Sequence, residues 1–229
     1  MLTIEESRFI AATADLLVDP PVVRRSPSQL GQDRWALYEL KRKRNGYFVE
    51  FGACDGLTLS NTLLLEREFG WNGIVAEPNP KWHKALLRNR HCAIDLQCVA
   101  AKSGETVPFV DAGELGGMKH AIALDGNTPG RAGAAEILVP TISLSDLLLK
   151  HKAPLEIDLL SIDTEGSEFE ILTAFAEDGG FIDRDIGLLC IEHNRTEAER
   201  KIRDFMAGLG YEQRFPVLSK WDGWFRKKE

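Results

Sequence analysis

Short apolar runs alternate with segments of helical periodicity along most of the chain. Runs rich in β-branched and aromatic residues predict buried strands at 47–51, 73–76, 93–100, 106–110, 137–142, 157–162 and 186–191. Apolar residues at helical spacing predict helices over 60–69, 80–90, 143–150, 167–175 and 197–209. This alternation is typical of a parallel sheet with helices on both faces. Two closing runs, 211–215 and 221–225, have no helix between them and predict an antiparallel hairpin.

Two segments depart from this alternation. Residues 1–27 predict an N-terminal helical extension that ends in a proline-rich connection, and 28–229 predict the main domain. Residues 111–135 are rich in Gly and Ala and show little periodicity, so we expect a long loop there, which is usually functional or mobile. The total of 229 residues suits a single α/β domain with its own core.

The amino-acid composition limits the classes of partner that the protein is expected to bind. The net charge is −7, with 28 Lys and Arg against 35 Asp and Glu. An acidic chain is poorly suited to nucleic acids or anionic membrane surfaces. No apolar run is long enough to cross a bilayer, and the first residues lack the basic region of a secretory signal. The 4 cysteines form no CxxC pair, so we expect free thiols. We therefore expect a cytoplasmic protein that binds neither nucleic acid nor membrane.

A glycine-rich turn after the first predicted strand carries the clearest chemical signal. The segment FVEFGACDG places the acids Glu50 and Asp55 beside Gly52 and Gly56, and residues 60–62 then begin a helix. Glycine lets a ligand approach the backbone closely. A dinucleotide fold would carry GxGxxG, whose helix N-terminus suits a pyrophosphate. Acids in the turn would repel a pyrophosphate and suit a cationic ligand such as S-adenosylmethionine, whose carboxylate residues 60–62 would hold.

The second predicted strand ends at Glu77, which is followed by Pro78 and Asn79. An acid at this point can accept hydrogen bonds from both ribose hydroxyls of a nucleoside. Alone it would equally suit a solvent-facing loop, but its place one strand after the glycine turn favours the ribose role. The predicted cofactor-binding residues are Glu50, Gly52, Ala53, Asp55, Gly56, Ser60, Asn61, Thr62, Glu77, Pro78, Asn79 and Asp163.

The chain resembles the FkbM family of methyltransferases in six segments. They are SQLGQD (28–33), GYFVEFGACDG (46–56), SNTLLLE (60–66), GWNGIVAEPNP (70–80), IDLLSIDTEGSEFEIL (157–172) and IEHN (191–194). The resemblance implies an α/β class I methyltransferase (Rossmann-like) fold: a mostly parallel seven-stranded sheet, helices on both faces and an antiparallel C-terminal hairpin. It also implies methyl transfer from S-adenosylmethionine to a hydroxyl of a sugar, glycan or polyketide-like small molecule.

Adenine recognition departs from the pattern of such enzymes. Many place an acid just past the third strand to meet the adenine amine. Here the segment reads CVAAKSGE (98–105), which leaves backbone groups or Ser103 for that contact.

The ends of two later predicted strands supply the candidate chemical groups. An alcohol is a weak nucleophile at neutral pH and needs a base, and open α/β sheets bind ligands at the carboxyl ends of their strands. Those ends read Asp-Thr-Glu (163–165) and Glu-His-Asn (192–194). His193 is the favoured general base because its ordinary pKa lies near neutrality, although a loop histidine without a chemical task is the alternative. Asp163 would orient the base or hold the cofactor, or else cap the following helix.

The same groups also suit a metal ion. Asp163, Glu165, Glu192 and His193 could form a Mg²⁺ or Ca²⁺ site, because hard cations favour carboxylate oxygens. The aromatic residues near the C-terminus, Trp221, Trp224 and Phe225, predict core packing of the final hairpin rather than a sugar-binding platform.

Other classes stay open at this point. A non-catalytic protein could keep the fold as a binding or scaffold module. A nicotinamide-dependent oxidoreductase is disfavoured by Asp55 and by the absent third glycine of GxGxxG. The expected partner is a small-molecule or glycan acceptor. The oligomeric state is open, with a homodimer as one alternative.

Overall fold

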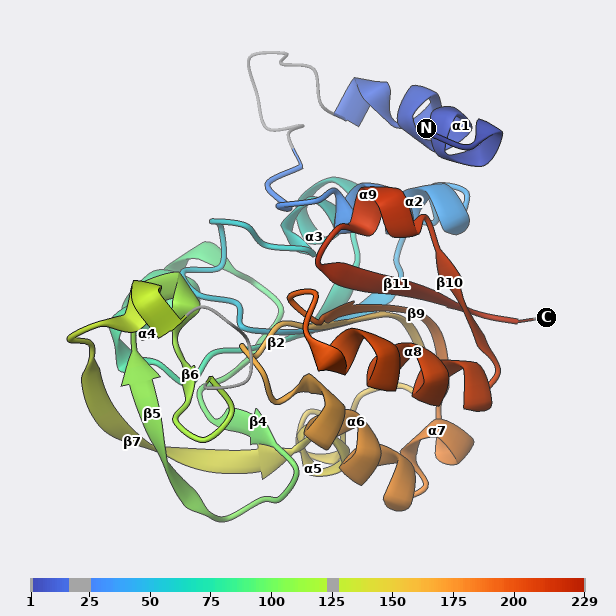
Figure 1. Cartoon of the computed structure of the whole chain (residues 1–229). Helices are drawn as coiled ribbons and strands as arrows, with labels where there is room; N and C mark the ends of the chain where they lie inside the picture. Colours follow the sequence, from blue (N-terminus) through green and yellow to red (C-terminus); the bar gives the residue numbers. More distant parts are fainter. Residues whose placement is uncertain (1, 17–25, 123–127, 229) are drawn as a thin grey trace.

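The computed structural model describes residues 2–16, 26–122 and 128–228 (Figure 1). In these residues, seven strands form one sheet in the order β10-β11-β9-β8-β1-β2-β3. They are β1 (Tyr47–Phe51), β2 (Asn72–Ala76), β3 (Ala93–Asp95), β8 (Glu156–Ile162), β9 (Asp185–Glu192), β10 (Tyr211–Arg214) and β11 (Asp222–Lys227). Strands β3, β2, β1, β8 and β9 are parallel, whereas β11 is antiparallel to β9 and β10. The expected class I methyltransferase fold with a C-terminal hairpin is confirmed, although a short helix, α9 (Pro216–Ser219), lies between the two hairpin strands, where no helix was expected.

Helices cover both faces of this sheet (Figure 1). One face carries α5 (Leu144–Lys150), α6 (Glu168–Glu177), α7 (Gly180–Asp183) and α8 (Glu197–Gly208). The other carries α1 (Ile4–Ala12), α2 (Gln32–Glu39), α3 (Leu63–Phe69), α4 (Pro80–Asn89) and α9 (Pro216–Ser219). Successive strand residues point to opposite faces, so Phe48 and Val49 of β1 pack into different apolar cores.

A second sheet lies beside the first and was not expected. Its strands, in the order β4-β7-β5-β6, are β4 (Cys98–Ala100), β7 (Ala135–Ser143), β5 (Thr106–Asp111) and β6 (Gly117–Met118). The prediction of one strand over 93–100 is wrong. The chain turns after Asp95, whose carboxylate accepts a hydrogen bond from the backbone N of Gln97 at 3.0 Å. The strands predicted at 106–110 and 137–142 exist, but they pair antiparallel with each other in this second sheet.

The segment expected to be a long loop, 111–135, contains short regular elements. They are η2 (Gly113–Leu115), β6 and η3 (Thr128–Arg131), while residues 123–127 lie outside the described part. Arg131 anchors this segment: its guanidinium donates to the carbonyl oxygens of Leu115 (2.6 Å) and Ile122 (3.1 Å) and to Glu165 (2.9 Å). The segment is thereby tied to the loop between β8 and α6.

The N-terminal helix α1 packs on the face that carries α2, and η1 (Ala14–Leu16) follows it. Its buried Phe9 stacks on Phe215 with ring centroids 5.4 Å apart and meets Trp224 edge-on. The proline-rich connection around Pro20 and Pro21 lies outside the described residues, and the domain division at residue 27 stays a prediction. Across residues 2–16, 26–122 and 128–228, no helix combines the length and hydropathy needed to span a bilayer.

Candidate cofactor and acceptor site

The ends of four parallel strands meet at one edge of the main sheet. Phe51 pairs with Ala76, and Ile162 pairs with Ile191. The residues that follow β1, β2 and β8, and the last residue of β9, therefore lie next to one another. Carboxyl ends of parallel strands are where open α/β sheets bind ligands.

The glycine turn after β1 depends on close backbone approach. Gly52 has φ +74°, and a Cβ there would lie 2.1 Å from the backbone O of Asp163. Only glycine tolerates both conditions. The backbone N atoms of Gly52 and Ala53 donate to the carbonyl O of Ala76 at 3.1 and 3.2 Å. The turn is thereby fixed between β2 and the end of β8.

Glu50 uses both carboxylate oxygens inside the protein. It accepts hydrogen bonds from the backbone N of Asn61 (2.6 Å), from the hydroxyls of Ser60 (3.1 Å) and Thr62, and from Arg90 (3.2 Å). These bonds explain why the helix expected from residue 60 begins at Leu63 instead. Glu50 shapes the cofactor loop through its neighbours, although it also borders the cavity described below.

Arg90, at the end of α4, was missed by sequence analysis. It is 2% exposed, and it donates to Glu50, to Glu66, to Ser60 (3.1 Å) and to Thr62 (2.7 Å). Nothing in the local sequence marks this role, because Arg90 and Glu50 are 40 positions apart and meet only when the chain folds back.

Asp55 and Asn79 hold the local turns. The carboxylate of Asp55 accepts from the backbone N atoms of Leu57 (2.9 Å) and Thr58 (2.8 Å). The side chain of Asn79 caps α4 by accepting from the backbone N of Lys81 at 3.1 Å. Both are predicted cofactor residues, and the contacts that they make here are with the chain itself.

Glu77 lies at the end of β2 and is 4% exposed. Its carboxylate accepts from the backbone N of Cys54 (2.9 Å) and of Asn79 (2.8 Å). Burial outweighs these two hydrogen bonds and raises the pKa of Glu77 to about 7. The carboxylate is therefore held in one orientation by two backbone amides.

A cavity of about 70 Å³ opens beside Glu77. Of the predicted cofactor residues, those that line it are Glu50, Gly52, Asn61, Glu77, Pro78 and Asp163. The other predicted cofactor residues do not line it: they are Ala53, Asp55, Gly56, Ser60, Thr62 and Asn79. The apolar residues Cys98, Val99, Phe109 and Met118 complete it and were not predicted. Ser103, suggested for adenine, instead donates to Asp146 and accepts from the backbone N of Ser143 at 2.8 Å.

A second cavity of about 380 Å³ adjoins the first. The two share Leu59, Asn61, Glu114, Asp163 and Glu165 as lining residues. Ligand pockets typically measure about 300–1,000 Å³, so the first cavity takes only part of a nucleoside such as S-adenosylmethionine. The remainder would extend past Asn61 toward the second cavity. This arrangement suits a donor and an acceptor that meet at Asp163.

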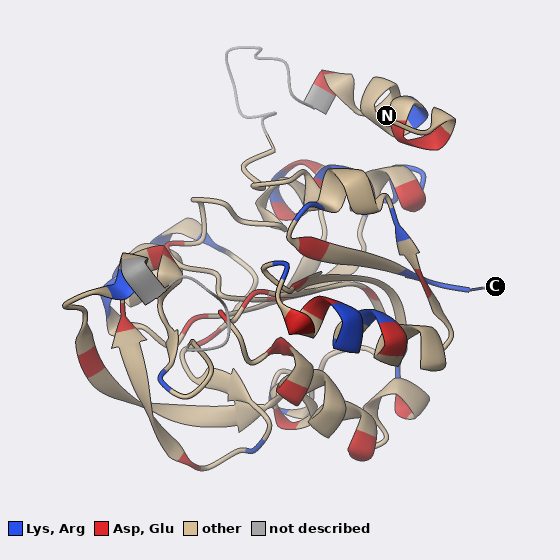
Figure 2. Cartoon of the chain, viewed as in Figure 1, with Lys and Arg blue, Asp and Glu red and all other residues tan. Residues whose placement is uncertain are grey.

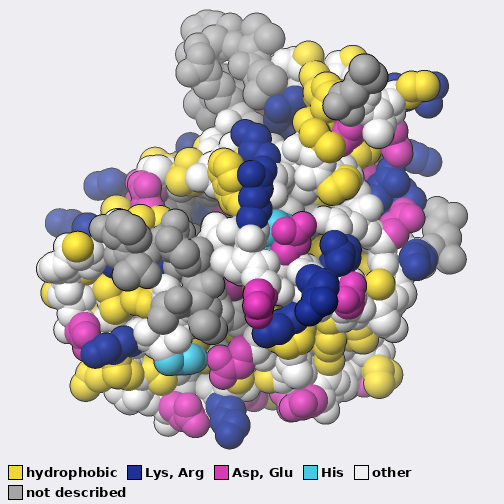
Figure 3. Space-filling view, in the orientation of Figure 1, with side chains coloured by type: hydrophobic (Ala, Val, Ile, Leu, Met, Phe, Trp, Pro, Cys, Tyr) yellow, Lys and Arg dark blue, Asp and Glu magenta, His cyan; other side chains and the backbone are white. Residues whose placement is uncertain are grey.

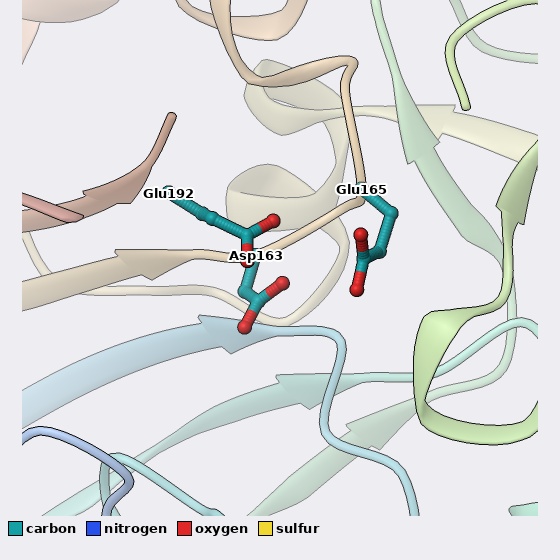
Figure 4. Close-up of side chains that lie close together, drawn as sticks. All are labelled: Asp163, Glu165 and Glu192. Atoms are coloured by element: carbon teal, nitrogen blue, oxygen red, sulfur yellow. The ribbon is translucent and has the colours of Figure 1, made fainter. Parts of the chain in front are cut away.

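Three carboxylates converge at the junction of the two cavities (Figure 4). One oxygen each from Asp163, Glu165 and Glu192 lies within 4.8 Å of the others. Glu165 is paired with Arg131 at 2.9 Å. Burial, with Asp222 and Glu168 nearby, raises the pKa of Asp163 to about 8. Burial and the Asp163 carboxylate raise the pKa of Glu192 well above its usual range.

His193 lies apart from this cluster. Its ring borders a groove of about 850 Å³ between α6 and α8, rather than the two cavities described above. Its Nδ1 accepts a hydrogen bond from the backbone N of Arg195 at 3.1 Å, and burial lowers its pKa. The structure thus brings three of the four predicted metal ligands together and leaves His193 outside the group.

Glu168 is a further residue that sequence analysis missed. It is buried, and its carboxylate accepts from the backbone N atoms of Thr164 (2.9 Å) and Gly166 (3.1 Å). It therefore shapes the turn that carries Asp163 and Glu165.

The strand order, the glycine turn after β1 and the acid at the end of β2 together define a class I methyltransferase, a fold that typically binds S-adenosylmethionine. The family model "Methyltransferase FkbM domain" matches residues 50–212, and the chain belongs to this family.

Solved structures of similar fold include a methyltransferase FkbM from Methylobacillus flagellatus KT, at 13% identity and TM-score 0.47, covering 96% of this chain and 58% of that one. A methyltransferase from Pyrococcus furiosus has 13% identity and TM-score 0.42, with 98% and 97% covered. The N-terminal domain of human METTL16 in complex with SAH has 14% identity and TM-score 0.44, with 98% and 82% covered. This chain thus spans 58% of the length of the Methylobacillus protein. Among curated proteins, the sequence has no match.

Proposed function

We propose that this protein transfers a methyl group from S-adenosylmethionine to a hydroxyl of a small acceptor, either a sugar or glycan or a polyketide-like molecule. One observation carries the proposal. Gly52 and Glu77 border one cavity, and that cavity joins a second, larger one at Asp163. A nucleoside donor and an alcohol acceptor need this kind of adjoining pair, because their reacting atoms must be brought into line.

Different residues of the first cavity would bind different parts of the cofactor. Glu77 would accept hydrogen bonds from the ribose hydroxyls, since its two oxygens are already oriented by backbone amides. Phe109 and Met118 offer apolar surface for the adenine ring. The amide nitrogen of Asn61 already donates to Ser161 at 3.0 Å, which makes it a poor donor for the cofactor's carboxylate, the role expected from the sequence.

The cofactor supplies a methyl group on a sulfonium, so the reaction breaks a C–S bond, forms a C–O bond and releases the hydroxyl proton. Asp163 borders both cavities and would orient the acceptor hydroxyl. His193 is the proposed base that removes the proton, although its ring faces the groove between α6 and α8. The roles of Asp163 and His193 are proposals, and substituting each residue separately tests them.

Binding of S-adenosylhomocysteine is the first test. A ligand that binds only the folded state stabilises it, so the thermal unfolding midpoint should rise with S-adenosylhomocysteine concentration. A non-catalytic scaffold that had lost the cofactor site would show no rise, which would contradict the proposal.

Substitution of the two proposed catalytic residues is the second test. Loss of a general base typically lowers turnover by about 10²–10⁴-fold. We expect His193→Ala to slow turnover in this way and to leave the Kd of S-adenosylhomocysteine unchanged. Asp163→Asn should affect both quantities, because Asp163 borders the cofactor cavity as well. Full activity of His193→Ala would show that His193 is not the base.

Besides S-adenosylmethionine, we propose that the protein binds a divalent cation. Asp163, Glu165 and Glu192 would supply three carboxylate ligands, which suits Mg²⁺ or Ca²⁺. Such an ion would lower the pKa of the acceptor hydroxyl. Methyl transfer measured in EDTA, and again after Mg²⁺ or Ca²⁺ is added back, tests this: full activity in EDTA would contradict it.

The class of the acceptor and the cellular location of the protein are also proposals. On the face shown, α8 carries both positive and negative side chains and α6 carries only acids (Figures 2 and 3). This distribution supports a small acceptor over a nucleic acid. The cytoplasmic location and the homodimer stay predictions.

A further inference from the structure

The second cavity is built from parts of the chain that are far apart in sequence. Gln29 comes from the segment before α2, and Gln32 is the first residue of α2. Asn194, Arg195 and Trp221 come from the two ends of the connection between β9 and β11. Glu114 and Leu115 come from η2. The cavity is therefore lined mostly by amide and carboxyl groups, with one indole.

Two buried hydrogen-bond acceptors on this cavity have no partner within the described chain. They are Oδ1 of Asn61, a residue 7% exposed, and Oε2 of Glu192, a residue 8% exposed. Leaving a buried polar atom unpaired is unfavourable, because the atom has lost its hydrogen bonds to water and gained none in return. The amide oxygen of Asn61 can only accept, so a ligand that donates a hydrogen bond to it would satisfy it, whereas a ligand with only acceptors would not.

Trp221 forms a fixed wall of the same cavity, which corrects the expectation that it packs in the hairpin core. Its ring is half-buried, and its indole N donates to the side-chain O of Gln29 at 3.0 Å. Its carbonyl O accepts from the backbone N of His193 (2.9 Å) and of Asn194 (3.1 Å). Both the backbone and the indole are therefore held in place, whereas Trp224 is the tryptophan of the hairpin core.

The charge of the cavity limits the ligand further. Asp163, Glu192 and the exposed Glu114 contribute carboxyl groups, Glu165 is paired with Arg131, and Arg195 is the lining residue of opposite sign. A phosphate or carboxylate on the acceptor would lie close to several carboxyl groups. Such a ligand is disfavoured because the ionised members of this group repel a second negative charge.

We propose that this second cavity is the acceptor site and that it takes an uncharged polyhydroxylated ring, with one face against Trp221 and hydroxyls directed at Asn61 and Glu192. The proposal rests on the proposed function and selects within it: a neutral sugar rather than an apolar polyketide or an anionic acceptor. An apolar ring would leave the two buried oxygens unpaired, while a sugar supplies donors all round its rim. Aromatic side chains beside planar polar groups suit such a ring because they offer apolar and hydrogen-bonding surface together.

The test measures methyl transfer from radiolabelled S-adenosylmethionine to three sets of acceptors. The first is a panel of neutral monosaccharides, namely glucose, galactose, mannose, fucose and rhamnose, each at 10 mM, a concentration on the order of ten times the upper range of typical KM values. The second is glucose 6-phosphate and glucuronate, and the third is an apolar macrolactone. We expect transfer to at least one neutral sugar and at least tenfold less to its charged counterpart and to the macrolactone. Transfer only to the second or third set overturns the proposal.

Variants then locate the site. We expect Trp221→Ala to raise the KM of the methylated sugar at least tenfold and Gln29→Ala to raise it about threefold. Both should leave kcat and the Kd of S-adenosylhomocysteine within twofold of the parent protein. Trp82→Ala, a matched change of a half-buried tryptophan on α4, should leave all three values unchanged. An unchanged KM in Trp221→Ala, in a protein that still binds S-adenosylhomocysteine, overturns the assignment of the site.

Failure of this proposal is distinguishable from failure of the proposed function. No stabilisation by S-adenosylhomocysteine would contradict the proposed function itself. Stabilisation by S-adenosylhomocysteine, without methyl transfer to any neutral sugar and without calorimetric binding of the sugars to the loaded protein, would overturn only the acceptor class.

Discussion

The cofactor loop and the acceptor cavity share one edge of the sheet, yet they are held in opposite ways. In the loop, the carboxylates of Glu50, Asp55 and Glu77 each accept hydrogen bonds from the chain itself. In the acceptor cavity, the buried oxygens of Asn61 and Glu192 have no partner in the part of the chain that the structure describes. The difference teaches that the loop is formed before any ligand arrives, whereas the acceptor cavity is completed by its ligand.

Preorganisation of the loop has an energetic reason. A site that is already ordered loses less conformational freedom when its ligand binds. Arg90 supplies much of this order, because it joins α4, α3, β1 and the residues that follow the glycine turn. A methyl donor of one fixed structure can be met by a rigid site. An acceptor site gains from groups that are satisfied only by the correct partner.

Arg90→Met should therefore give the largest effect. It leaves the buried carboxylates of Glu50 and Glu66 without their cation, and removal of one partner of a buried ion pair typically costs about 3–5 kcal/mol. We expect a loss of this size in the free energy of unfolding, measured by urea denaturation, together with loss of S-adenosylhomocysteine binding.

Two further variants sharpen this result. Arg67→Met removes an exposed arginine from neighbouring α3, whose side chain donates only to the carbonyl O of Asn89 in the described contacts, and should cost under about 0.5 kcal/mol. Glu50→Gln combined with Arg90→Met should recover part of the loss, because one unpaired charge is gone. Equal stability of Arg90→Met and Arg67→Met would contradict the view that the loop is organised around Arg90.

Binding of S-adenosylhomocysteine should depend on pH through Glu77. The carboxyl has a pKa of about 7 in the free protein and accepts ribose hydroxyls best when ionised. The group is mostly protonated at pH 6 and mostly ionised at pH 8, so affinity should fall as pH decreases through 7. We expect the Kd to be roughly tenfold larger at pH 6 than at pH 8, since nine in ten carboxyls are protonated one unit below the pKa.

Neighbouring groups define the control for this measurement. Burial raises the pKa values of the thiols of Cys54 and Cys98, so both stay neutral across this range, but Asp163, whose pKa is raised to about 8, also titrates beside the cavity. Glu77→Gln should bind more weakly at pH 8 and should lose most of the pH dependence. If the dependence persists in Glu77→Gln, it arises from one of the other carboxyls.

The same contrast explains what could be predicted from sequence. The sheet and its helices follow from local periodicity, and the positions of Gly52 and Glu77 follow from where strands end. The partners of Glu50 could not be predicted, because Arg90 reaches it only in the folded chain. The orientation of Trp221 was misjudged for a similar reason: its strand-like spacing with its neighbours hides the fact that it lies just before β11, where the backbone turns toward the cavity.

Substitution of Asp55 should give the smallest effect. It tests whether Asp55 only stabilises the cofactor loop or also contacts the ligand. Asp55 was predicted to bind the cofactor, but its carboxylate accepts from the backbone N atoms of Leu57 and Thr58 in the manner of a helix cap. Loss of such a cap typically costs about 0.5–2 kcal/mol of stability. Asp55→Ala should therefore lower the free energy of unfolding by about this amount and weaken S-adenosylhomocysteine binding only a few-fold. Asp55→Asn, which keeps one acceptor oxygen, should lie closer to the parent protein in both measurements. If Asp55→Ala instead keeps full stability and weakens binding as strongly as Glu77→Gln, Asp55 contacts the ligand directly, and the loop is less complete in the free protein than its hydrogen bonds indicate.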